Sequence, residues 1–249
     1  DFMPASYQKD VTGLVQEIGG QLDAELYDKT MVVVGKATKV LKEKKDFILN
    51  SKLAEQAIAG APVPKEVISK NWDAVVGMLD TLASSEIKTA AGLKGLDVRA
   101  FLAGTGGKLM ADGFALAAAM GQDPMKALEG FKAEAGTVEG DKATVKLTAP
   151  GGGEAKDETF VKVDGKWIPE DMAKDWTNAM AEAKKNLGGL PEQMKQMKPM
   201  AMGMLTQAEA AIDKLGAAKS QEEFDGVIVG LVASMQGGGG APQPTPNVP

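Results

Sequence analysis

Histidine and cysteine are both absent from this sequence of 249 residues. Without them the chain has no Ser-His-Asp or Cys-His nucleophile, no imidazole proton shuttle, no disulfide and no ordinary zinc site. Its 34 acidic residues include no pair in a distinctive context, and no run of alternating oxygen ligands around a glycine indicates a calcium loop. The sequence therefore predicts no catalytic, cofactor-binding or metal-binding residues, and we expect that the protein is not an enzyme.

Arginine is nearly absent as well, because Arg99 is the only one and every other fixed positive charge is a lysine. The net charge of −6 at pH 7 provides no global field that would attract nucleic acid. No apolar run approaches the roughly eighteen residues of a membrane span. We expect a protein partner or self-association, no nucleic acid and no transmembrane segment, with membrane tethering only if a lipid anchor precedes Asp1.

Aromatic residues are scarce too, at 5% of the sequence, while methionine is frequent, with 14 residues. Five methionines lie within eleven residues, namely Met194, Met197, Met200, Met202 and Met204. Thioether sulfurs are soft ligands that suit Cu(I). Methionine also fills irregular gaps in a core that has few aromatic rings, and others are scattered along apolar faces elsewhere. This scatter favours packing, in the core or against a partner, over metal binding.

Most of the sequence has the periodicity of amphipathic helices. Helices are predicted over about 5–26, 29–49, 67–82, 97–120, 125–131, 169–186, 191–198, 200–215 and 220–235. Asp97 is expected to cap one helix, and Ser220 with Glu223 forms a capping-box pattern at the start of another. Pro199 is expected to separate two helices, and Trp72 is expected to be a core anchor.

Between about residues 133 and 168 the apolar period changes to two, which is typical of half-buried strands. Tight turns are predicted at 139–142, at 150–153 and at Asp164-Gly165, where a type I′ turn needs positive φ at both central positions. The fold class that follows is α+β and mostly helical. A small antiparallel β-meander (about 133–168) packs against helices, with extra helices on both sides.

Four regions are expected along the chain. Residues 1–84 form an N-terminal helical region, 85–187 a helix plus β-meander domain, and 188–235 a C-terminal helical region. The remaining residues, 236–249, are rich in glycine and proline, and we expect a flexible, partly polyproline tail.

The strand region resembles a known group of proteins in the run from Gly140 to Leu147 (GDKATVKL) and the run from Phe160 to Trp167 (FVKVDGKW). Both are similar to the C-terminal hairpins of exported bacterial proteins of the nuclear-transport-factor-two-like, cystatin-related type. The resemblance covers residues of about 86–171, and the chain departs from it by its additional helices on both sides. It implies helices against a curved sheet that encloses a cone-shaped pocket, and a periplasmic, cell-surface or extracellular protein. Many members are lipoproteins, and no catalytic residue carries over.

Three residues are candidate contacts for a ligand or partner: Arg99, Trp167 and Trp176. The tryptophans flank the end of the predicted sheet, where they could line a pocket, and Arg99 could bind an anionic group. Alternatively, the tryptophans anchor helices on the sheet and Arg99 pairs with an acid. We expect a non-enzymatic structural or interaction protein of the bacterial envelope or exterior. The alternative hypothesis is a small-ligand-binding protein that uses a cavity between sheet and helices. A third hypothesis is an enzyme that works by carboxylates alone.

Overall fold

The computed structural model describes residues 3–52, 65–123, 125–126, 129–151 and 153–237. The protein is α+β and mostly helical, with one small antiparallel sheet, as predicted. Its helices are α1 (Ala5–Gln21), α2 (Ala24–Glu43), α3 (Lys45–Asn50), α5 (Lys65–Ser84), α6 (Ala90–Lys94), α7 (Val98–Ala103), α8 (Thr105–Ala119), α10 (Glu170–Leu187), α11 (Leu190–Ala217) and α12 (Gln221–Gly237), with a short 3-10 turn at Glu86–Lys88. The first two residues of the expected tail, 236 and 237, belong to α12, and the remainder, 238–249, lies outside the described residues.

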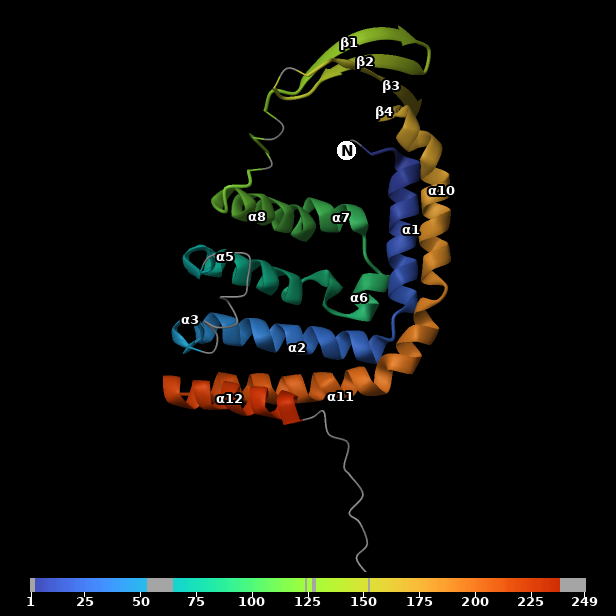
Figure 1. Cartoon of the computed structure of the whole chain (residues 1–249). Helices are drawn as coiled ribbons and strands as arrows, with labels where there is room; N and C mark the ends of the chain where they lie inside the picture. Colours follow the sequence, from blue (N-terminus) through green and yellow to red (C-terminus); the bar gives the residue numbers. More distant parts are fainter. Residues whose placement is uncertain (1–2, 53–64, 124, 127–128, 152, 238–249) are drawn as a thin grey trace, which may run out of the picture.

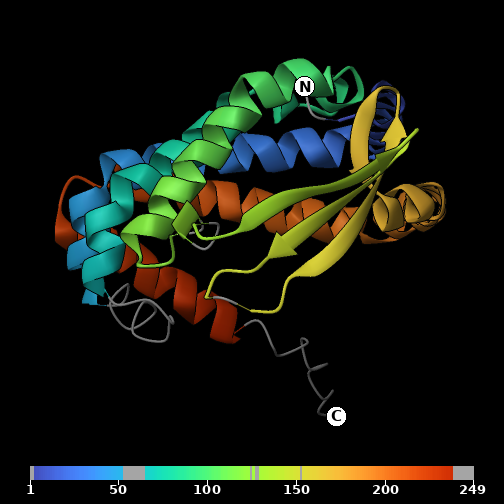
Figure 2. The same ribbon diagram turned by 90° about the horizontal axis from the view of Figure 1, so that it is seen from above.

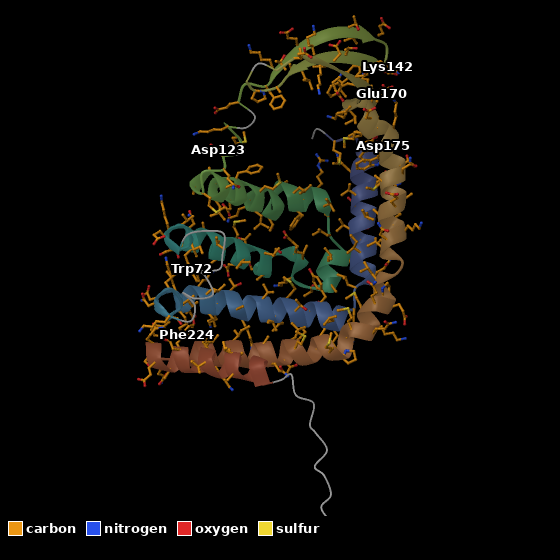
Figure 3. The ribbon with its side chains drawn as sticks, viewed as in Figure 1. Trp72, Asp123, Lys142, Glu170, Asp175 and Phe224 are labelled. Atoms are coloured by element: carbon orange, nitrogen blue, oxygen red, sulfur yellow. The ribbon has the colours of Figure 1, made fainter. Side chains whose placement is uncertain are left out.

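The helices form one open row. In Figure 1, α8, α5, α2 and α11 lie side by side, while α1 and α10 run across one end of the row. Figure 2 looks down on the sheet and shows α1 and α10 nearly end-on, which agrees with this crossing. Trp72 joins two members of the row, since its indole Nε1 on α5 donates to the Leu41 carbonyl of α2 at 3.0 Å (Figure 3), as its place in the amphipathic stripe predicted.

The first predicted helix ends earlier than expected. Leu22 is extended, with ψ 142°, and Asp23 starts α2 by accepting a hydrogen bond from the Leu26 backbone N–H at 3.0 Å. The prediction of one helix to Leu26 is therefore wrong. The chain turns a corner between α1 and α2, and the apolar period continues across it. The period alone therefore cannot locate the corner, whereas the capping hydrogen bond of Asp23 marks it.

The helix α11 is continuous through Pro199, so the predicted break there is wrong. An interior proline removes one backbone hydrogen bond and crowds the preceding turn. Extended packing of α11 along α2 holds the helix together, and next to the proline the Lys198 ammonium lies 2.9 Å from the Asp23 carboxylate and 2.7 Å from that of Glu25. Tertiary contacts here override the local propensity.

Glycine and capping residues divide the other helices. The predicted helix 97–120 is two helices, α7 and α8, separated at Gly104 with φ −107° and ψ −103°. Farther along, Met125 and Lys126 are helical, but Glu129 and Gly130 form a turn, so the predicted helix does not extend to Phe131.

The capping box that was predicted for the last helix forms in part. The Ser220 hydroxyl accepts from the Glu223 N–H at 3.2 Å, as predicted. The Glu223 carboxylate accepts from the Lys219 N–H at 2.8 Å, one residue before the usual position. The neighbouring Phe224 is 2% exposed and fixes the start of α12 against α3, where its ring centroid lies 5.8 Å from that of Phe47 (Figure 3).

The four strands follow in chain order as a meander: β1 (Lys132–Glu139), β2 (Lys142–Thr148), β3 (Lys156–Val163) and β4 (Lys166–Pro169). The tight turn between β3 and β4 has φ 48° at Asp164 and φ 78° at Gly165, which confirms the predicted type I′ geometry. The edge strand β1 is exposed along its whole length. Within the described part of the chain, α10 packs against the other end of the sheet, at β3 and β4.

The sheet is held at the junction of β4 with α10 and α1. Ile168 is buried there, and the Lys142 ammonium lies 3.0 Å from the Glu170 carboxylate (Figure 3). The Ser6 N–H, in the first turn of α1, donates to the Asp164 carboxylate at 2.7 Å. This bond satisfies one of the amides that every helix leaves unpaired at its N-terminus. The β3–β4 turn thus fixes the start of α1.

The fold buries few large apolar side chains. The accessible surface of the chain is 16438 Å², whereas a folded monomer of this length exposes about 10,500 Å². The undescribed residues would expose roughly 4,500 Å² as a fully extended chain. The difference between the two surface areas is larger than this, so these residues alone do not account for it. A single row of helices has two open faces, and this explains the excess.

Candidate functional sites in a cleft and on a helix face

A cleft of about 770 Å³ lies between α1 and α7, and we call it the α1/α7 cleft. The side-chain amide of Gln16 on α1 donates to the Leu96 carbonyl, just before α7, at 3.4 Å and so ties the two walls together. The cleft is lined by Met3, Gln8, Lys9, Val11, Thr12, Gly13, Gln16, Val98, Arg99, Leu102 and Ala103. No residue of the sheet lines it.

Local capping sets the α7 wall. The Asp97 carboxylate accepts from the Ala100 N–H at 3.0 Å, which confirms the predicted N-cap. It places Val98 and Arg99 in the first turn, with Leu102 one turn later on the same face. Arg99, a predicted contact residue, therefore lies at the cleft.

The lining combines apolar side chains with positive charge. Lys9 comes from α1 and Arg99 from α7, and the lining residues that the structure describes include no acid. The nearest acid in the α1 sequence, Asp10, is not part of the lining, because its carboxylate accepts a hydrogen bond from the Trp176 indole at 2.9 Å. The cleft is thus suited to a partly apolar ligand with a negative group.

Trp176 anchors α10 on α1. Its ring stacks on Tyr7 with 3.9 Å between the centroids and 5° between the planes. Burial, followed by the nearby carboxylates of Asp164 and Asp10, raises the pKa of the Tyr7 hydroxyl. Trp176 therefore joins two helices, whereas the structural alternative placed it between a helix and the sheet, and its ring is not part of the cleft lining.

Trp167 lies on β4 and is 41% exposed. Its cross-strand neighbour is Lys162, whose ammonium lies 5.7 Å from the ring centroid, a cation–π distance. Trp167 and Trp176 are therefore in different surroundings, and the structure does not bring either of them to Arg99.

A second candidate site is an uncharged face of α8. Its charged residues, Lys108 and Asp112, are 2.7 Å apart and lie on the side toward α5. The opposite side consists of Gly107, Met110, Ala111, Phe114 and Ala118, which we call the outer face of α8. Met110 is 55% exposed and Phe114 is 43% exposed. An exposed apolar stripe without charge is typical of a surface that contacts another molecule.

The methionine cluster divides by exposure along α11. Met197, Met200 and Met204 are exposed at helical spacing, while Met194 and Met202 are half-buried. Packing in a core therefore accounts for two of them at most. Packing against a partner and Cu(I) binding both stay predictions for the exposed three.

Among the residues that the structure describes, no three acidic side chains come together in a way that could hold a metal ion. Within the same ranges, no helix combines the length and hydropathy that crossing a bilayer requires. Comparisons with protein families, with curated proteins and with solved structures gave no match. The functional argument therefore rests on the two sites themselves.

Proposed function

We propose that this protein is a non-enzymatic structural protein of the bacterial envelope or exterior that assembles through contacts between copies of itself. The outer face of α8 is the observation that carries the proposal. Met110 and Phe114 stand one helical turn apart on a face without charge, at the end of the helix row. The same face of a second copy meets it without electrostatic repulsion, as an isologous contact requires.

The size of the exposed surface supports assembly. Standard interfaces bury about 800 Å² on each partner, and the excess surface that remains after the undescribed residues are allowed for, about 1,400 Å², is larger than this. Small and flexible side chains, as in the outer face of α8, allow close approach of two helices. Burial of Met110 and Phe114 would remove apolar area from water, which is the main driving force of association.

The location in the envelope or exterior rests on the resemblance of residues 140–147 and 160–167 to hairpins of exported bacterial families. A lipid tether is part of this proposal only if an anchor precedes Asp1. Fractionation of cells that produce the protein from its complete gene tests the location. We expect the protein outside the cytoplasmic fraction, and recovery in the cytoplasmic fraction alone would contradict this part of the proposal.

The assembly is tested by light scattering on the purified chain and two variants. We expect the wild type to have the mass of at least two chains, and Met110→Glu/Phe114→Glu to have the mass of one, because two like charges would face each other in the contact. Val229→Glu on α12 is the matched control, since Val229 is 54% exposed and lies away from α8. A monomeric wild type, or a double variant that assembles like the wild type, would contradict the proposal.

Binding of a small ligand in the α1/α7 cleft is a second candidate function. The observation that favours it is a volume of about 770 Å³ whose lining includes both Lys9 and Arg99. Titration with a fluorescent apolar probe tests it. Leu102→Asp on the cleft wall is expected to weaken the probe, and equal binding to the variant and to the wild type would place the probe elsewhere.

A further inference from the structure

We propose that β1 pairs antiparallel with β1 of a second copy, so that two four-stranded sheets become one continuous sheet. This inference rests on the proposed assembly from copies of the chain, and it adds a second part of the contact surface. Such an addition is needed, because the outer face of α8 consists of a few side chains on one helix, whereas a standard interface has roughly 20–30 residues on each side.

β1 is the edge strand of the sheet and offers a row of backbone groups to another strand. β2 pairs with one side of β1, and within the described residues no backbone hydrogen bond forms along its other side. All residues of β1 are exposed. An exposed edge of this kind is a template for a further strand, whose backbone supplies the missing partners.

A β-bulge determines which residues of β1 share a face. Before the bulge Lys132 lies opposite Thr148 of β2, and after it Glu139 lies opposite Lys142. Residues directly opposite each other in antiparallel strands point to the same face, and alternation along β2 puts Thr148 and Lys142 on one face. Lys132 and Glu139 therefore share this face, although in a strand without a bulge their spacing would place them on opposite faces.

Gly136 builds the bulge into the sequence. The register shifts between Ala135 and Val138, and a Cβ atom at Gly136 would lie 2.7 Å from the Thr144 carbonyl oxygen. Glycine alone allows that approach. The same alternation puts the apolar side chains of β1 on the face opposite to the charged ones: Ala133, Ala135 and Val138.

These two faces make β1 complementary to itself. A two-fold axis perpendicular to the sheet sets two copies of β1 antiparallel and keeps each face on its own side. When the strands overlap along their full length, Lys132 lies opposite Glu139 of the second copy, and Ala133 lies opposite Val138 of the second copy. The axis repeats each pair. Opposite charges in such positions stabilise a sheet, and Val138, which is 65% exposed, gains an apolar neighbour.

The outer face of α8 lies on the same side of the molecule as β1. In Figure 1 α8 ends the helix row on the side of the sheet, and Figure 2 shows β1 on the side of the sheet toward α8. One two-fold axis can therefore bring both elements against their counterparts in the second copy. The helix contact and the strand contact then form a single isologous interface.

Disulfide trapping tests the pairing and its register. Lys132→Cys and Glu139→Cys are purified separately and mixed under mild oxidation, since the chain has no cysteine of its own. We expect chains linked by a disulfide only in the mixture. Opposite positions place two Cα atoms about 5 Å apart, within reach of a disulfide, whereas two copies of the same position are about 20 Å apart in this register.

Charge reversal tests the same contact without a covalent bond. Lys132→Glu is expected to weaken assembly about tenfold, because two attractive pairs become repulsive, and Lys132→Glu/Glu139→Lys is expected to restore it. Lys156→Glu is the matched control, because Lys156 is an exposed lysine on β3, which is not an edge strand. Analytical ultracentrifugation over a range of concentrations measures assembly, and circular dichroism verifies that each variant is folded.

The outcomes separate this inference from the proposed function. Disulfides in Lys132→Cys alone that are as abundant as in the mixture, or a Lys132→Glu variant that assembles like the wild type, would overturn the pairing. If the wild type assembles but the mixture forms no disulfide, the pairing is wrong and assembly through α8 stands. If the wild type is monomeric and the mixture forms no disulfide, both are wrong. Disulfides in the mixture that persist with Met110→Glu/Phe114→Glu would support the pairing and contradict the α8 contact.

Discussion

At the scale of single residues, Gly19 marks the closest approach of α1 to α6. A Cβ atom at Gly19 would lie 2.5 Å from the backbone nitrogen of Lys94 and 2.7 Å from its Cα atom. Backbone atoms cannot move aside as a flexible side chain can, so only glycine fits. The next residue, Gly20, has no atom within 4 Å of the same position.

Gly19→Ala is therefore expected to lower the free energy of unfolding by about 2 kcal/mol through overpacking. Gly20→Ala is the matched control and is expected to be neutral or to stabilise the protein by up to about 1 kcal/mol, since alanine favours the helix. Urea unfolding measures both. Equal midpoints for the two variants would contradict the close packing of α1 on α6.

Gly165 allows a second test at this scale, with a φ of 78° that alanine rarely adopts. Gly165→Ala is expected to destabilise the protein by about 1 kcal/mol. The same change at Gly203, which lies inside α11 with open space around it, is expected to stabilise it by about 1 kcal/mol. Thermal unfolding of both variants should show shifts of opposite sign, and shifts of the same sign would refute the turn assignment.

At the scale of elements, ion pairs hold α11 against α2. The Glu209 carboxylate accepts from Lys29 and lies 2.9 Å from Lys36, which also lies 2.8 Å from Asp213. The hydrogen bond from Lys29, and then that from Lys36, lowers the pKa of Glu209 below its usual value of 4.5. A carboxyl group with a lowered pKa in the folded state stabilises the fold above its unfolded pKa, and this contribution is lost as the pH falls through the folded value.

Glu209→Gln is thus expected to lower the melting temperature at neutral pH. The difference from the wild type should shrink as the pH falls below 4.5 and vanish once the wild-type carboxyl group is protonated. Glu182→Gln on the exposed side of α10 serves as the control. A difference that is as large in acid as at neutral pH would mean that Glu209 acts through packing rather than charge.

The elements also show where sequence reasoning succeeds. Period two and the Asp164-Gly165 turn are local features, so the meander was predicted correctly, and Asp97 was predicted correctly as a cap. The corner at Asp23 interrupts an apolar period that continues across it, and the continuity of α11 at Pro199 is accompanied by contacts with distant residues, such as Lys198 to Asp23. The apolar period alone marks neither feature, and both predictions were wrong.

The residues of the candidate sites also differ in whether the local sequence marks them. Arg99 is distinctive because it is the only arginine, whereas Lys9 is one of many lysines and lies ninety residues from Arg99 in the sequence. Trp167 and Trp176 are close in sequence, yet β4 and α10 direct them to different partners, Lys162 and Tyr7. The outer face of α8 does have a signal in the sequence, since its uncharged positions recur at helical spacing.

At the scale of the whole molecule, an open row of helices leaves much apolar surface exposed. α1 packs against α6, α7 and α10, and α2 packs against α11, so packing joins segments that are distant in the sequence. The division into regions at 84, 187 and 235 stays a prediction. What a single layer cannot bury within one chain, a second chain can cover, and this is the central claim of the account.

The absence of cysteine permits a direct measurement of that claim, because one introduced cysteine is the only labelling site in the chain. A spin label at Ala111→Cys lies on the outer face of α8, and one at Lys184→Cys lies on α10 as the control. Dipolar spectroscopy is expected to show strong coupling between chains for the Ala111 label and weaker coupling for the Lys184 label. An Ala111 label without coupling between chains, whether the protein is monomeric or assembles through another surface, would contradict the account.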